Sequence, residues 1–181
     1  MKKYIIAVVI AFLLTGCGTK NLMNTPTKKV EMFFENYQTL DDDVLEQLDN
    51  TVKQSTEFTE SQKEEYKRLM KKHYQSLKYD IKDETVDGDR ATVTAEIEVK
   101  DYSKIMSEAD SYLEKNQKEF EDEEGNYSKE KFMDYRLEQL KKAEDTVKYT
   151  IELSLTKIDD EWKLDNLSDA DMQKINGIYN Y

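Results

Sequence analysis

The sequence predicts an α+β protein in which N-terminal helices pack on a four-stranded antiparallel sheet. Two observations predict this class: apolar residues recur every three or four positions up to residue 77, and at every second position in two later segments. The first period is typical of amphipathic helices and the second of strands with one buried face. A sheet with one apolar face needs cover, and amphipathic helices supply it.

Three helices are predicted before any strand. Thr25-Pro26 provides an N-cap followed by proline at the first helical position. The second helix is expected to begin at a capping box formed by Thr39 and Asp42. The third is expected to begin at a capping box formed by Ser61 and Glu64. The first helix then carries an apolar stripe of Val30, Phe33, Phe34, Tyr37 and Leu40.

Two hairpins are predicted after these helices. Residues 77–82 and 91–100 alternate between apolar and polar side chains, with the turn Asp87-Gly88-Asp89 between them. A second hairpin is predicted over 147–164, with its turn at Asp159-Asp160. The face that we expect to point inward consists of Tyr79, Ile81, Val93, Ala95, Ile97, Tyr149, Ile151, Leu153, Trp162 and Leu164.

A helical insertion at residues 102–146 separates the two hairpins. Antiparallel neighbours need only a short turn, so the insertion is either an additional layer of the core or a projecting recognition element. We expect it to pack on the sheet, because the apolar face needs covering helices. After the last strand, Ser168 and Asp171 predict the cap of a short C-terminal helix.

The first seventeen residues indicate export. Lys2-Lys3 precedes an apolar run, Tyr4–Leu14, that is shorter than the roughly 20 residues of a membrane-spanning helix. The next residues complete Leu14-Thr15-Gly16-Cys17, which resembles a bacterial lipobox and implies cleavage before Cys17 and a diacylglyceryl group on its sulfur. We therefore expect a signal peptide at 1–16, a lipidated cysteine with a short tether at 17–25, and a single domain at 26–181.

Charge and cysteine content narrow the classes of function. Removal of residues 1–16 leaves 25 Lys and Arg against 39 Asp and Glu, a net charge of −14. Such an acidic chain gains nothing from counterion release on a nucleic acid and is repelled by anionic lipids. We therefore expect no nucleic-acid partner and a covalent anchor, with palmitate or similar acyl chains holding Cys17 in the bilayer at the outer face of the cytoplasmic membrane. Cys17 is the only cysteine, so once it is acylated no thiol remains for a disulfide, a thiolate nucleophile or a cysteine metal site.

Several short segments together resemble the bacterial lipoproteins whose soluble part has the nuclear-transport-factor-two-like fold, also called cystatin-like. The resemblance covers residues 25–101 and 147–178 and implies a cone-shaped arrangement of helices on a sheet. Many such lipoproteins have no known function, while ketosteroid isomerases share the architecture, so the resemblance implies no single activity. The segments that carry it are Thr25-Pro26, Asp41–Leu48, Asp87-Gly88-Asp89-Arg90-Ala91 and Lys157–Leu164.

The candidate pocket residues are Tyr79, Tyr149, Trp162 and His73. His73 is the only histidine and could act as a general base, but it shares a helical face with apolar residues, which favours a packing role. The inward face of the predicted sheet is apolar, which argues against catalysis. We therefore expect a non-catalytic binding or accessory module with an envelope protein as partner and no cofactor. The alternative is a small-ligand carrier or a ketosteroid-isomerase-like enzyme with an apolar pocket inside the cone.

An acidic segment at Glu121–Asn126 suggests a calcium loop, but its register is wrong. If Gly125 takes the sixth position of an EF-hand, Phe120 occupies the first ligand position and Lys131 the place of the bidentate glutamate. We expect a solvated loop between two helices, with Ser128 as the cap of the second helix and no bound metal.

Overall fold

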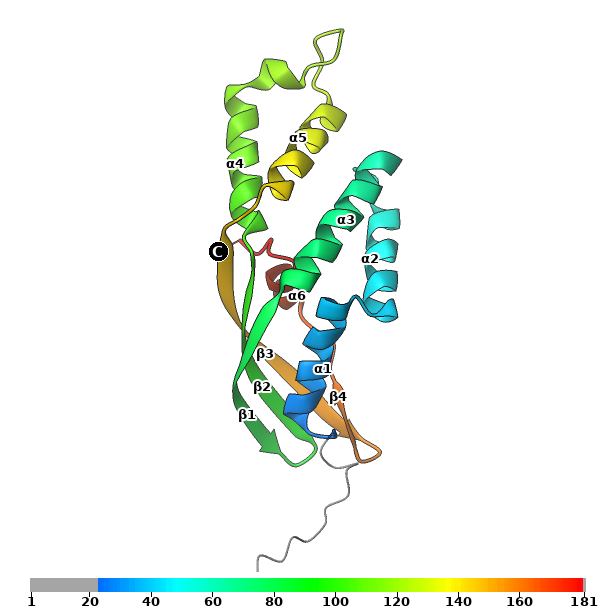
Figure 1. The fold of residues 1–181 in the computed structure, drawn as a ribbon, viewed down its shortest axis with the longest axis vertical. Coiled ribbons are helices and arrows are strands. Elements are labelled where there is room, and N and C mark those ends of the chain that lie inside the picture. The colour runs from blue at the N-terminus through cyan, green and yellow to red at the C-terminus, as the bar shows by residue number, and fades with distance from the viewer. Residues whose placement is uncertain (1–22, 181) are drawn as a thin grey trace, which may run out of the picture.

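The computed structural model describes residues 23–180, so the predicted cleavage site and Cys17 lie outside the described residues. The fold class is α+β, as predicted, with helices packed against a four-stranded antiparallel sheet (Figure 1). In chain order the elements are α1 (Pro26–Thr39), α2 (Asp42–Gln54), α3 (Glu60–Ser76), β1 (Lys78–Asp87), β2 (Arg90–Lys100), α4 (Tyr102–Lys115), the 3₁₀ helix η1 (Gln117–Phe120), α5 (Lys129–Lys141), β3 (Thr146–Ile158), β4 (Glu161–Leu164) and α6 (Asp169–Ile175).

The sheet has the order β1-β2-β3-β4, with every neighbouring pair antiparallel. Both predicted hairpin turns are confirmed. Gly88 has φ +60° in the first turn, and Asp159 and Asp160 have φ +51° and +62° in the second. Aspartate tolerates this left-handed conformation better than most residues, which is why two aspartates can make the second turn. The registers place Ala91 opposite Leu155, so the apolar residues of β2 and β3 share one face.

Helix α1 lies on the apolar face of the sheet. Val30 and Phe34 are fully buried there, and the Phe34 ring stacks on Tyr79 of β1 with the centroids 4.8 Å apart. The predicted cap is confirmed, because the Thr25 side chain accepts a hydrogen bond from the backbone N–H of Lys28. Large apolar side chains that are under 2% exposed fill the space between helices and sheet, so this part of the core is closely packed.

Two predicted caps were wrong. Thr39 belongs to the last turn of α1, where its hydroxyl donates to the carbonyl of Glu35, so Asp41 caps α2 instead. Helix α3 begins one residue before Ser61, and its capping box is formed by Thr59 and Gln62. In both cases a capping residue close to the predicted one has the extended or near-extended backbone that a cap requires. The caps predicted at Ser128 and Ser168 are confirmed.

Only the part of the insertion that lies next to the strands belongs to the main core. Tyr102 and Leu140 belong to the main core, whereas Ala109, Phe120 and Phe132 form a second buried cluster within the insertion. Helices α4 and α5 therefore pack on each other and extend beyond the sheet as a helical hairpin (Figure 1). The expectation that the insertion packs on the sheet was wrong for this distal part, because its own aromatic residues bury one another.

The first described residues lie at the opposite end of the molecule, beside the β3–β4 turn (Figure 1). The side chain of Asn24 donates to the carbonyl oxygen of Asp160 at 2.7 Å and accepts from the backbone N–H of Trp162 at 3.0 Å. These two hydrogen bonds fix the start of the domain to the sheet. None of the helices within residues 23–180 is long and apolar enough to cross a bilayer.

Candidate functional site

An apolar hollow of about 230 Å³ lies among residues of α2, α3, α4 and α5. These helices form the end of the molecule that is remote from the β turns (Figure 1). Thr51, Ser55, Glu57 and Arg136 contribute polar groups to its wall. The remaining lining is apolar or aromatic and consists of Val52, Phe58, Tyr66, Tyr102, Met106, Met133, Leu137, Leu140 and Ile178.

The wall on the α3 side is positioned by the segment that joins α2 to α3. The Phe58 ring from this segment stacks on Tyr66 of α3, with the centroids 5.2 Å apart and the planes inclined by 25°. The capping box of Thr59 fixes where α3 begins, and therefore which residues of α3 lie beside Phe58. Glu57 forms an ion pair with Lys129 of α5, with 3.1 Å between Oε1 and Nζ. This ion pair connects the wall on the α3 side with the wall on the α5 side.

The spacing between α3 and α5 depends on Gln62, a polar side chain that is only 2% exposed. Its amide nitrogen donates to the backbone carbonyl of Glu130 at 3.0 Å and to the carboxylate of Asp134 at 2.8 Å. Its amide oxygen accepts from the backbone N–H of Thr59. Because a buried amide costs stability unless it is hydrogen-bonded, these contacts hold the two helices in one arrangement.

Arg136 contributes a charged group to the wall of the hollow. Its Nη2 donates to the carboxylate of Asp110 on α4 at 2.7 Å, and its guanidinium lies 5.0 Å from the centroid of the Phe132 ring. The Nε atom is buried and has no hydrogen-bond partner among residues 23–180. An unpaired buried donor is unfavourable, so this N–H would gain from an acceptor that reached it.

The aromatic hydroxyl groups of the hollow stay protonated at neutral pH. Burial raises the pKa of Tyr66 and that of Tyr102 above the ordinary value for tyrosine. Both hydroxyls are therefore neutral, and Arg136 and Glu57 are the charged members of the lining. Such a lining suits an apolar group that carries a hydrogen-bond acceptor.

His73 lies next to the hollow but does not line it. Its ring packs on Tyr102, with the centroids 4.7 Å apart, and its Nε2–H donates to the backbone carbonyl of Ile175 at 2.8 Å. The side chain is 1% exposed, and burial lowers the pKa of His73 to about 4 although the bond to Ile175 opposes the shift. This position is that of a buried packing residue between α3 and the C-terminal segment.

The other three predicted pocket residues lie apart from the hollow. Tyr79 stacks on Phe34, the Tyr149 hydroxyl donates to the backbone carbonyl of Tyr179 at 3.2 Å, and Trp162 is buried beside Asn24 at the far end of the sheet. The structure therefore does not bring the four into one cavity. Sequence periodicity predicted the apolar faces of α4 and α5. It gave no indication that Phe58 and Arg136 would line one hollow together with those faces.

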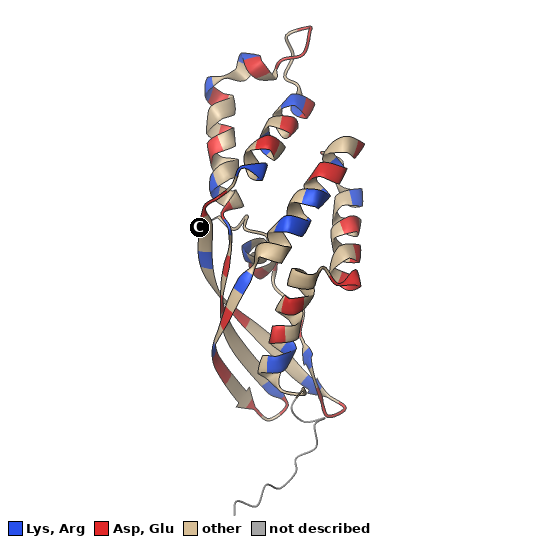
Figure 2. Cartoon of the chain, in the orientation of Figure 1, with Lys and Arg blue, Asp and Glu red and all other residues tan. Residues whose placement is uncertain are grey.

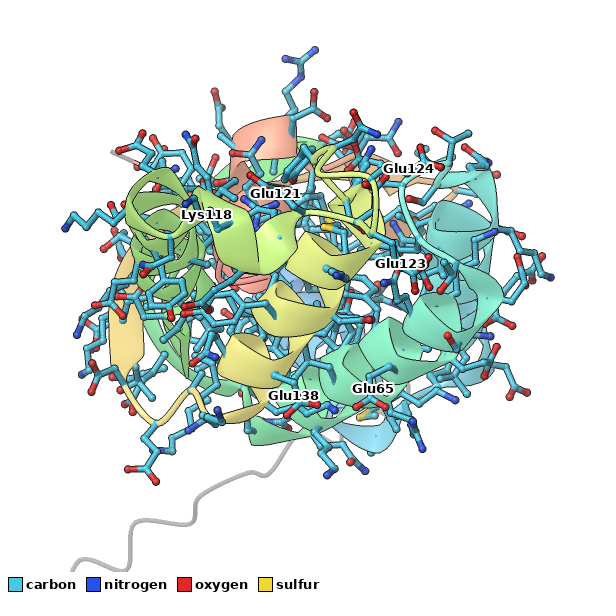
Figure 3. All side chains as sticks on the ribbon, turned by 90° about the horizontal axis from the view of Figure 1, so that it is seen from above. Glu65, Lys118, Glu121, Glu123, Glu124 and Glu138 are labelled. Atoms are coloured by element: carbon cyan, nitrogen blue, oxygen red, sulfur yellow. The ribbon has the colours of Figure 1, made fainter. Side chains whose placement is uncertain are left out.

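The acidic segment forms a loop at the tip of the helical hairpin. The Asp122 carboxylate accepts hydrogen bonds from the backbone N–H groups of Glu124 at 2.9 Å and Asn126 at 2.8 Å, which lowers the pKa of Asp122. Within the described part of the chain, no three acidic, histidine or cysteine side chains are grouped as a metal would require. Figure 3 looks onto this end, where Glu121, Glu123 and Glu124 lie near the tip.

No family model and no curated protein matches the chain. Among solved structures, it is similar to that of a "putative lipoprotein", ycdA, from Bacillus subtilis, with 17% identity and a TM-score of 0.46. The similarity covers 91% of this chain and 51% of the other, so the present chain spans about half the length of that protein.

Proposed function

We propose that this chain is a lipid-anchored lipoprotein of the cell envelope, on the outer face of the cytoplasmic membrane, and that it is a non-catalytic binding module. The lipobox sequence Leu14-Thr15-Gly16-Cys17 supports the anchor. The observation that supports binding is the apolar hollow, whose lining includes nine apolar or aromatic residues and Arg136, a residue whose buried Nε–H has no partner among residues 23–180. A concave apolar site with few polar groups is the usual form of a binding site.

The position of Asn24 supports an orientation for this module. Met23 lies six residues after Cys17, and a chain of that length reaches at most about 21 Å. The β3–β4 turn beside Asn24 would then face the bilayer, and the helices around the hollow would point away from it (Figure 1). A net charge of −14 after cleavage would also keep the domain off an anionic lipid surface.

A small-ligand carrier is the second candidate, because the hollow itself favours it. A free aromatic or branched aliphatic molecule could occupy the same apolar space without a protein partner. The ketosteroid-isomerase-like alternative lacks comparable support, since Phe34 of α1, Ile97 of β2 and Ile151 of β3 are each at most 1% exposed and fill the space between α1 and the sheet.

The anchor is tested by a Cys17→Ala substitution. The wild-type chain should incorporate an alkyne analogue of palmitate in growing cells and partition into detergent, and the variant should do neither. Unchanged labelling and partitioning of Cys17→Ala would contradict the proposed anchor.

The orientation is tested by thiol labelling of two single-site variants, because acylated Cys17 carries no free thiol. Glu123→Cys at the hairpin tip and Asp160→Cys in the β3–β4 turn should both react with an impermeant maleimide in cells whose wall has been removed. Energy transfer from the attached dye to a membrane dye should be stronger at position 160 than at 123. Equal transfer would contradict the orientation, and lack of labelling would contradict the outer-face location.

A further inference from the structure

The size of the hollow separates two kinds of occupant. A cavity of about 150 Å³ holds benzene, whereas sites for free organic ligands usually measure about 300–1,000 Å³. At about 230 Å³ the hollow lies between these limits. It matches one large apolar side chain, which a partner protein would present while the rest of its surface lay outside the hollow.

Arg136 indicates which backbone group accompanies that side chain. Its Nη2 donates a hydrogen bond to the carboxylate of Asp110, but its buried Nε–H has no partner among residues 23–180. A peptide segment that inserts a side chain also brings a backbone carbonyl, which is an acceptor. The carbonyl of a bound segment would satisfy this N–H, whereas a hydrocarbon ligand would leave it unpaired.

The net charge of the helical end that contains the hollow indicates the flanking residues of the segment. Residues 41–76 and 102–141, which include the four helices of the hollow, contain 20 acidic and 13 basic side chains, a net charge of −7. Figure 2 shows acidic residues along α2 and in the loop at the hairpin tip. From Glu119 in η1 to Glu124 in this loop, five of six residues are acidic. A second copy of this chain would be repelled there, and a basic segment would be attracted.

We propose that the hollow is the docking site for a basic segment of a partner protein, with one aromatic or branched aliphatic side chain inserted as the anchor and a backbone carbonyl bonded to Arg136. The proposal rests on the binding role proposed above and names the class of partner. The inserted side chain supplies the apolar contact, and the surrounding lysine or arginine residues supply charge complementarity to the acidic helical end.

The test uses the mature lipidated protein in a zwitterionic detergent and nine-residue synthetic peptides. The probe has a central phenylalanine flanked by lysines. One control peptide replaces the phenylalanine with alanine, and a second replaces the lysines with glutamates. Isothermal titration calorimetry measures affinity, and the methyl signals of Met106 and Met133, which line the hollow, report the place of binding by NMR. Met32 on α1 is the control signal, because it lies outside the hollow.

The lysine-flanked phenylalanine peptide should bind at least tenfold more tightly than either control peptide and should shift Met106 and Met133 but not Met32. Its affinity should fall as salt is raised, because the flanking charges are exposed. Equal binding of the alanine peptide would overturn the anchor, and equal binding of the glutamate peptide would overturn the charge complementarity. Free indole that binds as tightly as the peptide would overturn the proposal in favour of a small-ligand carrier.

Two pairs of variants locate the contacts. Thr51→Trp places a large ring at the hollow and should abolish binding, while Gln47→Trp, one turn earlier on α2 and outside the lining, should bind like wild type. Arg136→Lys keeps the charge but removes the Nε–H, and should weaken binding about tenfold, whereas Arg68→Lys at an exposed position of α3 should have no effect. Equal effects within either pair would overturn the assignment of the hollow.

These measurements are independent of the lipid-anchor experiment. Loss of the anchor in cells with peptide binding intact would remove the proposed location but keep this docking site. An intact anchor with no shift of Met106 and Met133 by the lysine-flanked peptide would overturn the docking site and leave the lipoprotein assignment unchanged.

Discussion

Gln62 and Asp134 join the two helices that form opposite sides of the hollow, through a hydrogen bond of 2.8 Å between a side-chain amide and a carboxylate. The same glutamine completes the capping box at the start of α3. A residue that was predicted only as part of an amphipathic helix therefore stabilises the helix start and also the position of the inserted hairpin.

Replacement of Gln62 by alanine should lower the free energy of unfolding by about 2 kcal/mol, because a cap and a buried interhelical hydrogen bond are lost together. Gln75→Ala is the matched control, since Gln75 is exposed on the same helix and should change stability by less than about 0.5 kcal/mol. Urea denaturation of both variants measures the difference. A Gln62→Ala variant as stable as Gln75→Ala would show that the bond to Asp134 contributes little.

His73 makes stability depend on pH. Burial lowers the pKa of His73 from 6.5 to about 4, so between these values the unfolded chain binds a proton that the folded chain does not. The stabilising contribution of the neutral ring is therefore complete above pH 7 and is lost as pH falls towards 4. Between pH 7.5 and pH 5 the wild type should lose about 2 kcal/mol relative to His73→Gln.

The comparison with His73→Gln removes the contribution of the many carboxylates, which both proteins share. The free energy of unfolding of each protein is measured by urea denaturation at pH 7.5, 6 and 5. Parallel curves for the two proteins would mean that His73 is protonated in the folded state as readily as in the unfolded state.

Gly177 permits a close approach between the end of α6 and β2. It has φ +70°, and a Cβ atom at this position would lie 2.1 Å from the backbone oxygen of Lys100 and 3.0 Å from His73 Cε1. Gly177→Ala should therefore cost more than about 3 kcal/mol, the sum of left-handed strain and a backbone clash.

Gly125 provides the control for this substitution. It also has a left-handed backbone, with φ +85°, but no atom lies within 4 Å of the Cβ position. Gly125→Ala should cost only about 1 kcal/mol from backbone strain. Thermal unfolding of the two variants measures the difference, and equal losses would contradict the predicted clash at Gly177.

Chelation should leave stability unchanged. The Asp122 carboxylate already accepts backbone N–H groups within its own loop, which stabilises the loop without a cation. The melting temperature of the mature protein should be the same in millimolar EDTA and in millimolar calcium chloride. A rise in calcium that EDTA reverses would assign a cation to Glu121–Asn126.

The sequence was sufficient to predict the sheet, because alternation in 91–100 and 147–156 places every apolar residue of these strands on one face. Helix starts were less reliable. Thr39 satisfies the capping pattern but belongs to the last turn of α1. Only the backbone conformation distinguishes it from Asp41, which caps α2. Local patterns cannot reveal which of two neighbouring polar residues has the extended conformation of a cap.

The candidate site depends on contacts between distant segments, which explains why it was not predicted. Phe58 comes from a loop without a periodic pattern, and Arg136 appears in the sequence as an ordinary charged residue of an amphipathic helix. Their place in one hollow follows from the packing of α5 on α3, which Gln62 fixes from a position with no distinctive sequence signal. Three of the four predicted pocket residues, Tyr79, Tyr149 and Trp162, lie on the sheet, and core side chains fill its inner face.

The central claim is a lipid-anchored module, and the N-terminus of the mature protein tests it most directly. Intact-mass and peptide mass spectrometry of the protein purified from its own cell membranes should find Cys17 as the first residue, with a diacylglyceryl group on its sulfur. A protein that retains residues 1–16, or that carries a free thiol at Cys17, would contradict the account.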